Sequence, residues 1–186
     1  VGMAGMKIFK IEFNDINGGS IRCYATHKDN SSFDSVENYK LINEIRHKEF
    51  DLELDTDKPY QAFQQRIGNL KYELHTLLTK LKGEGKRVHI YGASTKGNTI
   101  LQWCSIDHTL VEYAAERNPD KYGAKTLGTN IQIISEEESR AMNPDYYLVL
   151  PWHFKEEFIE REKNALANGT GFVFPVPVVE VFKKDK

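Results

Sequence analysis

The sequence from Lys86 onward alternates short apolar runs with longer helix-like stretches, and this alternation limits the folds open to the chain. Strands are expected at four apolar runs, residues 87–91, 110–115, 145–150 and 170–174. Helices are expected between them, through Ile100, Leu101 and Trp103, at about 136–142 and at 153–166. Strands that alternate with helices pair in parallel through right-handed crossovers. We therefore expect an α/β fold with a Rossmann-like, mostly parallel sheet flanked by helices.

The sequence begins with a pattern typical of a β-hairpin. Residues 7–13 alternate apolar and polar side chains, residues 14–19 form a turn, and residues 20–26 return. Gly18 and Gly19 supply the positive φ values that such a turn needs. A hairpin alone is only marginally stable in water, so this one must pack on something else. Because it begins almost at residue 1, we expect the chain to be cut from a longer protein.

Two helices are expected after the hairpin, and the second is long. Residues 36–50 carry apolar side chains at near-helical spacing. From Pro59, apolar residues repeat at steps of three and four until Gly83 and Gly85 end the pattern. This stripe indicates a helix face packed on a domain, and a free coiled coil is the alternative. The predicted division is 1–57 for the hairpin and first helix, 58–182 for the Rossmann-like domain with the long-helix appendage, and 183–186 for a solvated tail.

The composition argues against several classes of partner and site. With 25 Lys and Arg against 27 Asp and Glu, the formal charge of −2 provides no basic surface for nucleic acid. No apolar run approaches the roughly 20 residues that span a bilayer, so no membrane partner is expected. Two distant cysteines, Cys23 and Cys104, argue against a disulfide scaffold and favour a reducing cytoplasm. The histidines show no metal-ligand spacing, so no metal site is expected.

The stretch Tyr-Gly-Ala-Ser-Thr-Lys-Gly-Asn-Thr at residues 91–99 lies between a predicted strand and a predicted helix. Free backbone N–H groups and the helix dipole favour an anion at such a position. Gly92 allows a tight turn, and Gly97 allows the helix to approach the sheet closely. Ser94 can donate a hydrogen bond, and Lys96 adds a mobile positive charge. A diphosphate or carboxylate could bind here, and a plain strand-to-helix turn is the equal alternative.

This turn departs from two common nucleotide-binding motifs. In the dinucleotide motif GxGxxG, the second glycine would stand where Ser94 stands. In the motif GxxxxGK[ST], a lysine would stand where Asn98 stands, and Lys96 comes two residues early. The turn alone therefore predicts neither NAD nor ATP binding.

Three further residues stand at predicted strand ends, the edge where open α/β sheets bind ligands. Glu116 ends the second strand, where an acid can bind ribose hydroxyls; a solvated turn with Arg117 and Asn118 is the favoured alternative. Trp152 could stack on a base or sugar ring, although an aromatic cap on the core is the more common role. His153 has no carboxylate or second histidine at motif spacing, which favours a solvated or helix-capping role over catalysis.

Five pieces, in order along nearly the whole chain, resemble the C-terminal domain of bacterial sugar-nucleotide C-methyltransferases of the deoxysugar type. They are residues 17–22 (Asn-Gly-Gly-Ser-Ile-Arg), 86–99 with the glycine turn, 116–121 (Glu-Arg-Asn-Pro-Asp-Lys), 150–154 (Leu-Pro-Trp-His-Phe) and 175–177 (Pro-Val-Pro). The string Gly-Ala-x-x-Lys-Gly-Asn-Thr is specific to this group. Relatives usually have histidine in place of Asn17 and aspartate in place of Glu116, and often a small apolar or proline pair in place of Ala93 and Ser94. These departures leave the sugar and its contacts undetermined.

The resemblance implies a zinc-binding N-terminal domain and an S-adenosylmethionine domain before this one, with a nucleotide-diphospho-keto-sugar in the cleft between the last two. The cofactor would be bound by the missing upstream domain, and this chain alone is expected to be inactive. No catalytic residue is assigned. The expected substrate-binding residues are Gly92, Ala93, Ser94, Lys96, Gly97, Asn98, Glu116, Asn118, Trp152 and Phe154.

Two other readings of the sequence stay open. The chain could be a stand-alone Rossmann-type nucleotide-binding module, which tight NAD or NADP binding would indicate. It could also be a structural or oligomerisation domain in which the glycine turn holds nothing. The sequence does not decide the sugar, the base, the ring carbon or the oligomeric state.

Overall fold

The computed structural model describes residues 1–183, so Lys184 and Lys186 of the expected tail lie outside the described residues. Two compact units are present, the first from Val1 to Gln65 and the second from Arg66 onward. The division falls inside the long helix α2, Lys58–Gly83. Lys183, at the start of the tail, places its ammonium 4.8 Å from the ring centroid of Tyr146.

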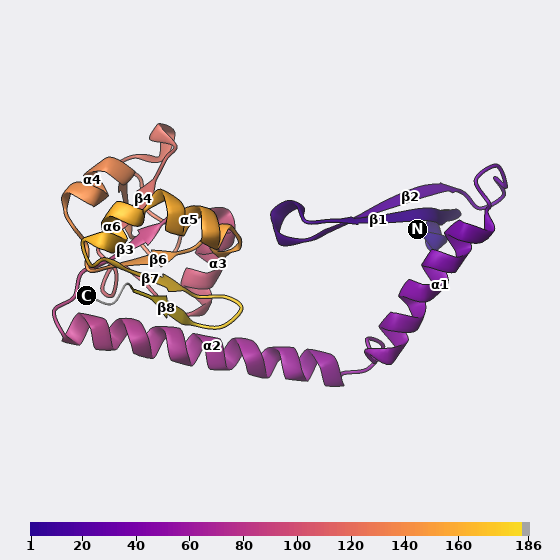
Figure 1. Ribbon diagram of the computed structural model, residues 1–186. Helices are drawn as coiled ribbons and strands as arrows, with labels where there is room; N and C mark the ends of the chain where they lie inside the picture. The colour runs from indigo at the N-terminus through magenta and orange to yellow at the C-terminus, as the bar shows by residue number, and fades with distance from the viewer. Residues whose placement is uncertain (184–186) are drawn as a thin grey trace. The chain divides into compact units, whose positions relative to one another are not determined.

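The first unit contains a β-hairpin and a helix (Figure 1). After a 3-10 turn, η1 (Gly2–Ala4), strands β1 (Met6–Asn14) and β2 (Ser20–His27) pair antiparallel across a second 3-10 turn, η2 (Ile16–Gly18). Helix α1 (Val36–Asp51) follows, and the Ser35 hydroxyl caps it by accepting a hydrogen bond from the Asn38 N–H. The predicted hairpin and the helix at 36–50 are therefore confirmed. Among the described side chains of this unit, Ile11 is the one buried apolar residue.

A six-stranded sheet forms the centre of the second unit, in the order β5-β4-β3-β6-β7-β8. The strands are β3 (Val88–Tyr91), β4 (Tyr113–Glu116), β5 (Gln132–Ser135), β6 (Tyr146–Val149), β7 (Gly171–Phe174) and β8 (Glu180–Phe182). All neighbours pair in parallel except β7 and β8, which are antiparallel. This confirms the predicted α/β fold with a mostly parallel sheet.

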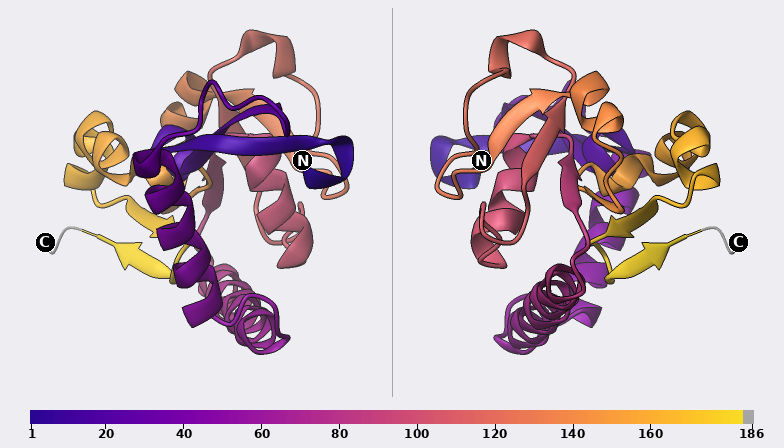
Figure 2. Two further views of the ribbon diagram at one scale, coloured as in Figure 1. Left: turned by 90° about the vertical axis from the view of Figure 1, so that its right-hand side faces the viewer. Right: turned by 90° about the vertical axis from the view of Figure 1, so that its left-hand side faces the viewer.

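Helices cover both faces of this sheet, as the two views of Figure 2 show. One face packs on α2 and α3 (Thr95–Trp103) through Leu74, Leu78, Leu81 and Leu101, which are almost fully buried. The other face packs on α5 (Lys155–Arg161) and α6 (Lys163–Ala167) through Phe158 and Leu166. Leu74, Leu78 and Leu81 confirm that the C-terminal part of the stripe packs on a domain, whereas Phe63 at its start is 53% exposed.

The remaining helical elements of the second unit are short. Helix α4 (Glu136–Ala141) begins with a capping box, in which Ser135 and Glu138 satisfy each other's backbone N–H groups. The 3-10 turns η3 (Pro119–Lys121) and η4 (Trp152–Phe154) follow β4 and β6. Both turns lie after the carboxyl ends of parallel strands, so they contribute to the edge where open α/β sheets bind ligands.

The structure differs from the sequence-based expectation in four places. The strand expected at 110–115 begins only at Tyr113, because the N–H groups of Leu110 and Val111 turn back to the carbonyl of Asp107. The helix expected at 153–166 is divided into η4, α5 and α6, and it is interrupted at Glu162, with φ −101° and ψ 23°. Strands β5 and β8, of four and three residues, were not among the expected strands, although their stretches carry β-branched apolar residues.

Candidate functional site

The sheet order reverses between β3 and β6, so the crevice at their carboxyl ends is the expected ligand site of such a fold. A cavity of about 470 Å³ opens there, within the size range of small-molecule sites. Its walls come from the ends of β3, β4 and β6 and from α4 and α5. The lining residues are Tyr91, Gly92, Ser94, Glu116, Arg117, Lys121, Glu136, Pro151, Phe154, Glu157, Phe158 and Arg161.

The glycine turn brings β3 to the N-terminus of α3. Gly92 has φ +84°, and a Cβ there would lie 2.8 Å from Cγ of Pro151. Ser94 caps α3, since its hydroxyl accepts a 3.0 Å hydrogen bond from the Gly97 N–H. At Gly97 a Cβ would lie 2.5 Å from Cδ1 of Leu150, which confirms the close approach of helix and sheet. The turn is thus held on both sides, by Pro151 and by Leu150.

Glu116 is an anchored carboxylate at the wall of the cavity rather than a solvated turn residue. Its side chain is 14% exposed. One oxygen accepts hydrogen bonds from the N–H groups of Arg117 and Asn118, at 2.9 and 3.2 Å. The other accepts from the Lys121 ammonium at 3.0 Å, and this ammonium also donates to the carbonyl of Ala93. Burial opposes ionisation, but these donors outweigh it and lower the pKa of the Glu116 carboxyl.

Beneath the cavity lies a buried charged network that the sequence pattern did not reveal. Glu162, 3% exposed, accepts a 2.6 Å hydrogen bond from the hydroxyl of Tyr91. The Arg140 guanidinium donates to both oxygens of Glu162, at 3.1 and 2.6 Å, and to Glu136 at 2.9 Å. Burial and the Glu162 carboxylate raise the pKa of Tyr91, so its hydroxyl stays protonated and serves as a donor.

Arg161 contacts this network and also lines the cavity. The central carbon of its guanidinium lies 5.0 Å from the ring centroid of Tyr91 and 4.6 Å from that of Phe158. One guanidinium nitrogen lies 3.5 Å from the Glu136 carboxylate. Cation–π contacts and an ion pair therefore hold the guanidinium plane in place.

Four of the ten expected substrate-binding residues line the cavity: Gly92, Ser94, Glu116 and Phe154. The other six are not among its lining residues, namely Ala93, Lys96, Gly97, Asn98, Asn118 and Trp152. Lys96 is exposed in the first turn of α3, and Asn118 caps η3 by accepting a hydrogen bond from the Asp120 N–H. Trp152 packs against the core of the α5 face, as an aromatic cap would. The binding roles of all ten residues stay predictions.

Sequence reasoning missed most of the charged walls, which are formed by Arg117, Lys121, Glu136, Glu157 and Arg161. A signal for part of them was present. Phe154, Glu157, Phe158 and Arg161 stand at i, i+3, i+4 and i+7, a spacing that places side chains on one helix face. Lys121 and Glu136 are separated in the sequence and come to the same cavity only through the fold of the sheet, so no local pattern could have joined them.

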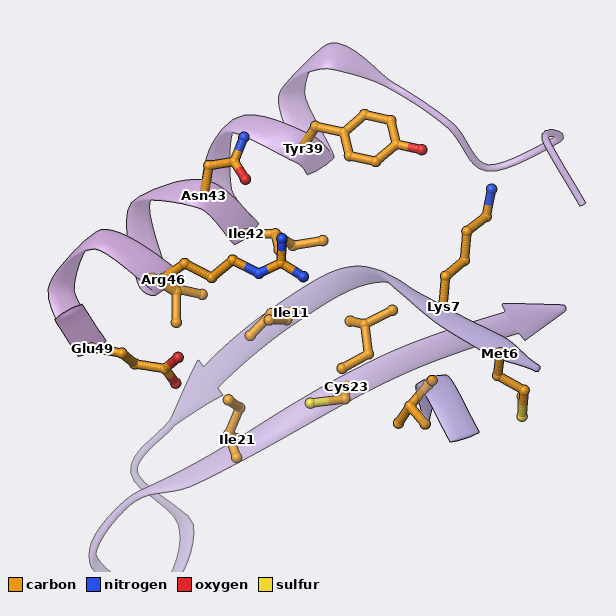
Figure 3. A pocket seen from close by; sticks show the side chains of 14 residues that line it. Met6, Lys7, Ile11, Ile21, Cys23, Tyr39, Ile42, Asn43, Arg46 and Glu49 are labelled. Atoms are coloured by element: carbon orange, nitrogen blue, oxygen red, sulfur yellow. The ribbon is translucent and has the colours of Figure 1, made fainter. Parts of the chain in front are cut away.

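A second cavity, of about 560 Å³, lies within the first unit between the hairpin and α1 (Figure 3). Its labelled hairpin side chains include Ile11, Ile21 and Cys23, and those of α1 include Ile42 and Arg46. None of the expected substrate-binding residues lines it, so the switch-point cavity is the stronger candidate.

The described part of the chain contains neither a candidate metal cluster nor a membrane-spanning helix. Among residues 1–183, no cluster of three or more His, Cys, Asp or Glu side chains is arranged to hold a metal ion. In the same range, no helix has both the length and the apolar character required to cross a membrane.

Comparison with known proteins places this geometry in context. A model of the family described as the C-methyltransferase C-terminal domain matches residues 15–177. The C-methyltransferase NovU of Streptomyces niveus is 28% identical over 181 residues, which make up 97% of this chain and 42% of that relative. The chain therefore spans less than half the length of the relative that it matches.

Proposed function

The chain belongs to the family of C-methyltransferase C-terminal domains, and from this premise we propose that it binds the sugar-nucleotide substrate of an S-adenosylmethionine-dependent C-methyltransferase. In this proposal the substrate is a nucleotide-diphospho-keto-deoxysugar. The partner is a preceding domain that carries the cofactor, and the chain alone is inactive.

The composition of the switch-point cavity is the observation that carries this proposal. Cationic Arg117 and Lys121 can attract a diphosphate, and the turn at Ser94 adds the N-terminus of α3 beside them. Carboxylates line the same walls and accept hydrogen bonds from ribose or sugar hydroxyls. The exposed ring of Phe154 offers a surface for stacking. A sugar nucleotide combines these three chemistries in one molecule.

The reaction requires more than this chain provides. Methylation of the carbon next to a ketone needs a base that removes the α proton, and the enolate then attacks an electrophilic methyl group. S-adenosylmethionine supplies that methyl group when bound. Ser94 stands where a glycine-rich cofactor turn would have its second glycine. The proposal therefore places the cofactor in the preceding domain and gives this chain the task of holding and orienting the substrate.

Calorimetric titration of this chain with dTDP, S-adenosylmethionine and NAD, each alone, tests the proposal. We expect dTDP to bind and the other two not to bind. Lys96 stands in the first turn of α3, outside the lining of the cavity, and the sequence predicts that it contacts the phosphate; Lys96→Ala should therefore weaken dTDP binding about tenfold. The matched control is Lys80→Ala, which removes an exposed lysine of α2.

Each alternative result has a distinct meaning. A Lys96→Ala variant that binds dTDP as tightly as the parent contradicts a diphosphate role for Lys96. Tight NAD binding favours the stand-alone nucleotide module. Failure to bind dTDP even when the chain is joined to its upstream domain favours a structural or oligomerisation domain.

A further inference from the structure

One helical face supplies a whole wall of the switch-point cavity. Phe154, Glu157, Phe158 and Arg161, together called the η4–α5 face, all line it at spacings of i, i+3, i+4 and i+7. Glu156 and Glu160 belong to the same helix but do not line the cavity. The helix therefore directs one chemically distinct set of side chains toward the cavity.

The members of this face differ in what they can recognise. The Phe154 side chain is 46% exposed, so its ring can cover a flat ligand. Glu157 presents carboxylate oxygens, which only accept hydrogen bonds when ionised. Arg161 presents a planar guanidinium, which only donates. Along one helix face, Phe154 thus offers a stacking surface, Glu157 an acceptor and Arg161 a donor. This order matches a planar ring whose edge carries an N–H beside a carbonyl or ring nitrogen.

Contacts at both ends hold this face in place. The Lys155 ammonium pairs with Glu180 of β8 at 2.7 Å. At the other end, buried Glu162 bonds Tyr91 of β3 and Arg140 of α4, and between the two ends Phe158 is buried in the core. A surface fixed before the ligand arrives loses less conformational entropy on binding.

From these observations we propose that the η4–α5 face recognises the nucleobase of the bound sugar nucleotide. The base stacks on Phe154, its N–H donates to Glu157, and its neighbouring acceptor receives a hydrogen bond from Arg161. The diphosphate then binds to Arg117 and Lys121, which follow β4, and to the glycine turn. This inference rests on the proposed function, since it names the residues that select the nucleotide within the same cavity.

Isothermal titration of the parent chain with dTDP, UDP, CDP, ADP, GDP and inorganic pyrophosphate tests this inference. Glu157→Gln removes the charged acceptor, and Arg161→Lys keeps the positive charge but removes the planar fork. The matched control is Glu156→Gln, the same chemical change one residue away on a different face. Thermal unfolding of each variant confirms that it is folded.

We expect the parent to prefer one or two of the nucleotides. Glu157→Gln and Arg161→Lys should each weaken the preferred nucleotide about tenfold and leave pyrophosphate binding unchanged, while Glu156→Gln behaves as the parent. Equal losses for nucleotide and pyrophosphate would overturn base recognition, because they would place the diphosphate on this face. If Glu157→Gln and Arg161→Lys bind the nucleotide as tightly as Glu156→Gln does, base recognition by this face is overturned, but the proposed function still stands. Failure to bind any nucleotide, both by the chain alone and by the chain joined to its upstream domain, would overturn both proposals.

Discussion

Glu162 is a single residue on which three elements of the second unit depend. Its carboxylate is buried and bonds Tyr91 of β3 and Arg140 of α4, while its own backbone separates α5 from α6. Burial alone would raise the pKa of this carboxyl, but Arg140 and Tyr91 outweigh burial and lower it. The folded state therefore favours ionised Glu162, and its interactions contribute to the stability of the fold.

Glu162→Gln should lower the free energy of unfolding by about 2 kcal/mol at pH about 7, because hydrogen bonds to a buried charge are lost. Because the folded-state pKa is lowered, this contribution is fully present above the unfolded-state pKa and is lost as pH falls through the folded-state value. The difference between parent and variant should therefore shrink in acid. Urea unfolding at several pH values measures it.

Glu160→Gln provides the control for this experiment. Glu160 forms an exposed ion pair with Lys163 on the same part of the chain, and exposed pairs contribute little. Its loss should change the free energy of unfolding by less than about 1 kcal/mol. If Glu162→Gln lowers the free energy of unfolding no more than Glu160→Gln does, the buried network does not stabilise the fold.

At the scale of elements, the contact between α3 and β6 fixes the position of the glycine turn. Gly97→Ala would place a methyl carbon 2.5 Å from Cδ1 and 2.9 Å from Cβ of Leu150, so helix and strand must separate. Such overpacking should cost about 1 to 3 kcal/mol of unfolding free energy. Thermal unfolding followed by circular dichroism measures the loss.

Gly68→Ala is the matched substitution for the Gly97 experiment. Gly68 lies inside α2, and no atom comes within 4 Å of a Cβ built there. Alanine should stabilise the helix by roughly 0.5 to 1 kcal/mol, since glycine loses more backbone freedom on folding. Equal effects at both positions would show that helix propensity, rather than the Leu150 contact, decides the outcome at Gly97.

The elements differ in whether a local sequence pattern predicts them. The sheet strands at 87–91, 145–150 and 170–174 and the long helix were predictable, because buried runs and the leucine stripe are local signals. The position of Glu116 at a strand end was predictable for the same reason. Other features depend on neighbours that only folding brings together, so a local pattern does not contain them. They are the pairing of Glu116 with Lys121, the ion pair of Arg161 with Glu136, and the break at Glu162.

At the scale of the whole molecule, the two units differ in how much apolar surface they bury. In the described part of the second unit, the sheet is covered on both faces by apolar side chains, among them Ile90, Leu148 and Phe172 at 0% exposure. Among the described apolar side chains of the first unit, Ile11 alone is buried, while Phe13, Ile21 and Phe50 are more than half exposed. Burial of apolar surface is the main source of folding free energy, so the units should differ in stability.

Hydrogen exchange followed by mass spectrometry tests this difference on the intact chain. Amides of β1, β2 and α1 should exchange much faster than those of β3, β6 and β7, because a hairpin with little buried surface opens locally at small cost. Adding dTDP should further slow exchange around Gly92 and α5 if the nucleotide binds there. Equal protection of the two units would instead indicate one cooperative fold, in which the exposed side chains of the hairpin do not lower its stability.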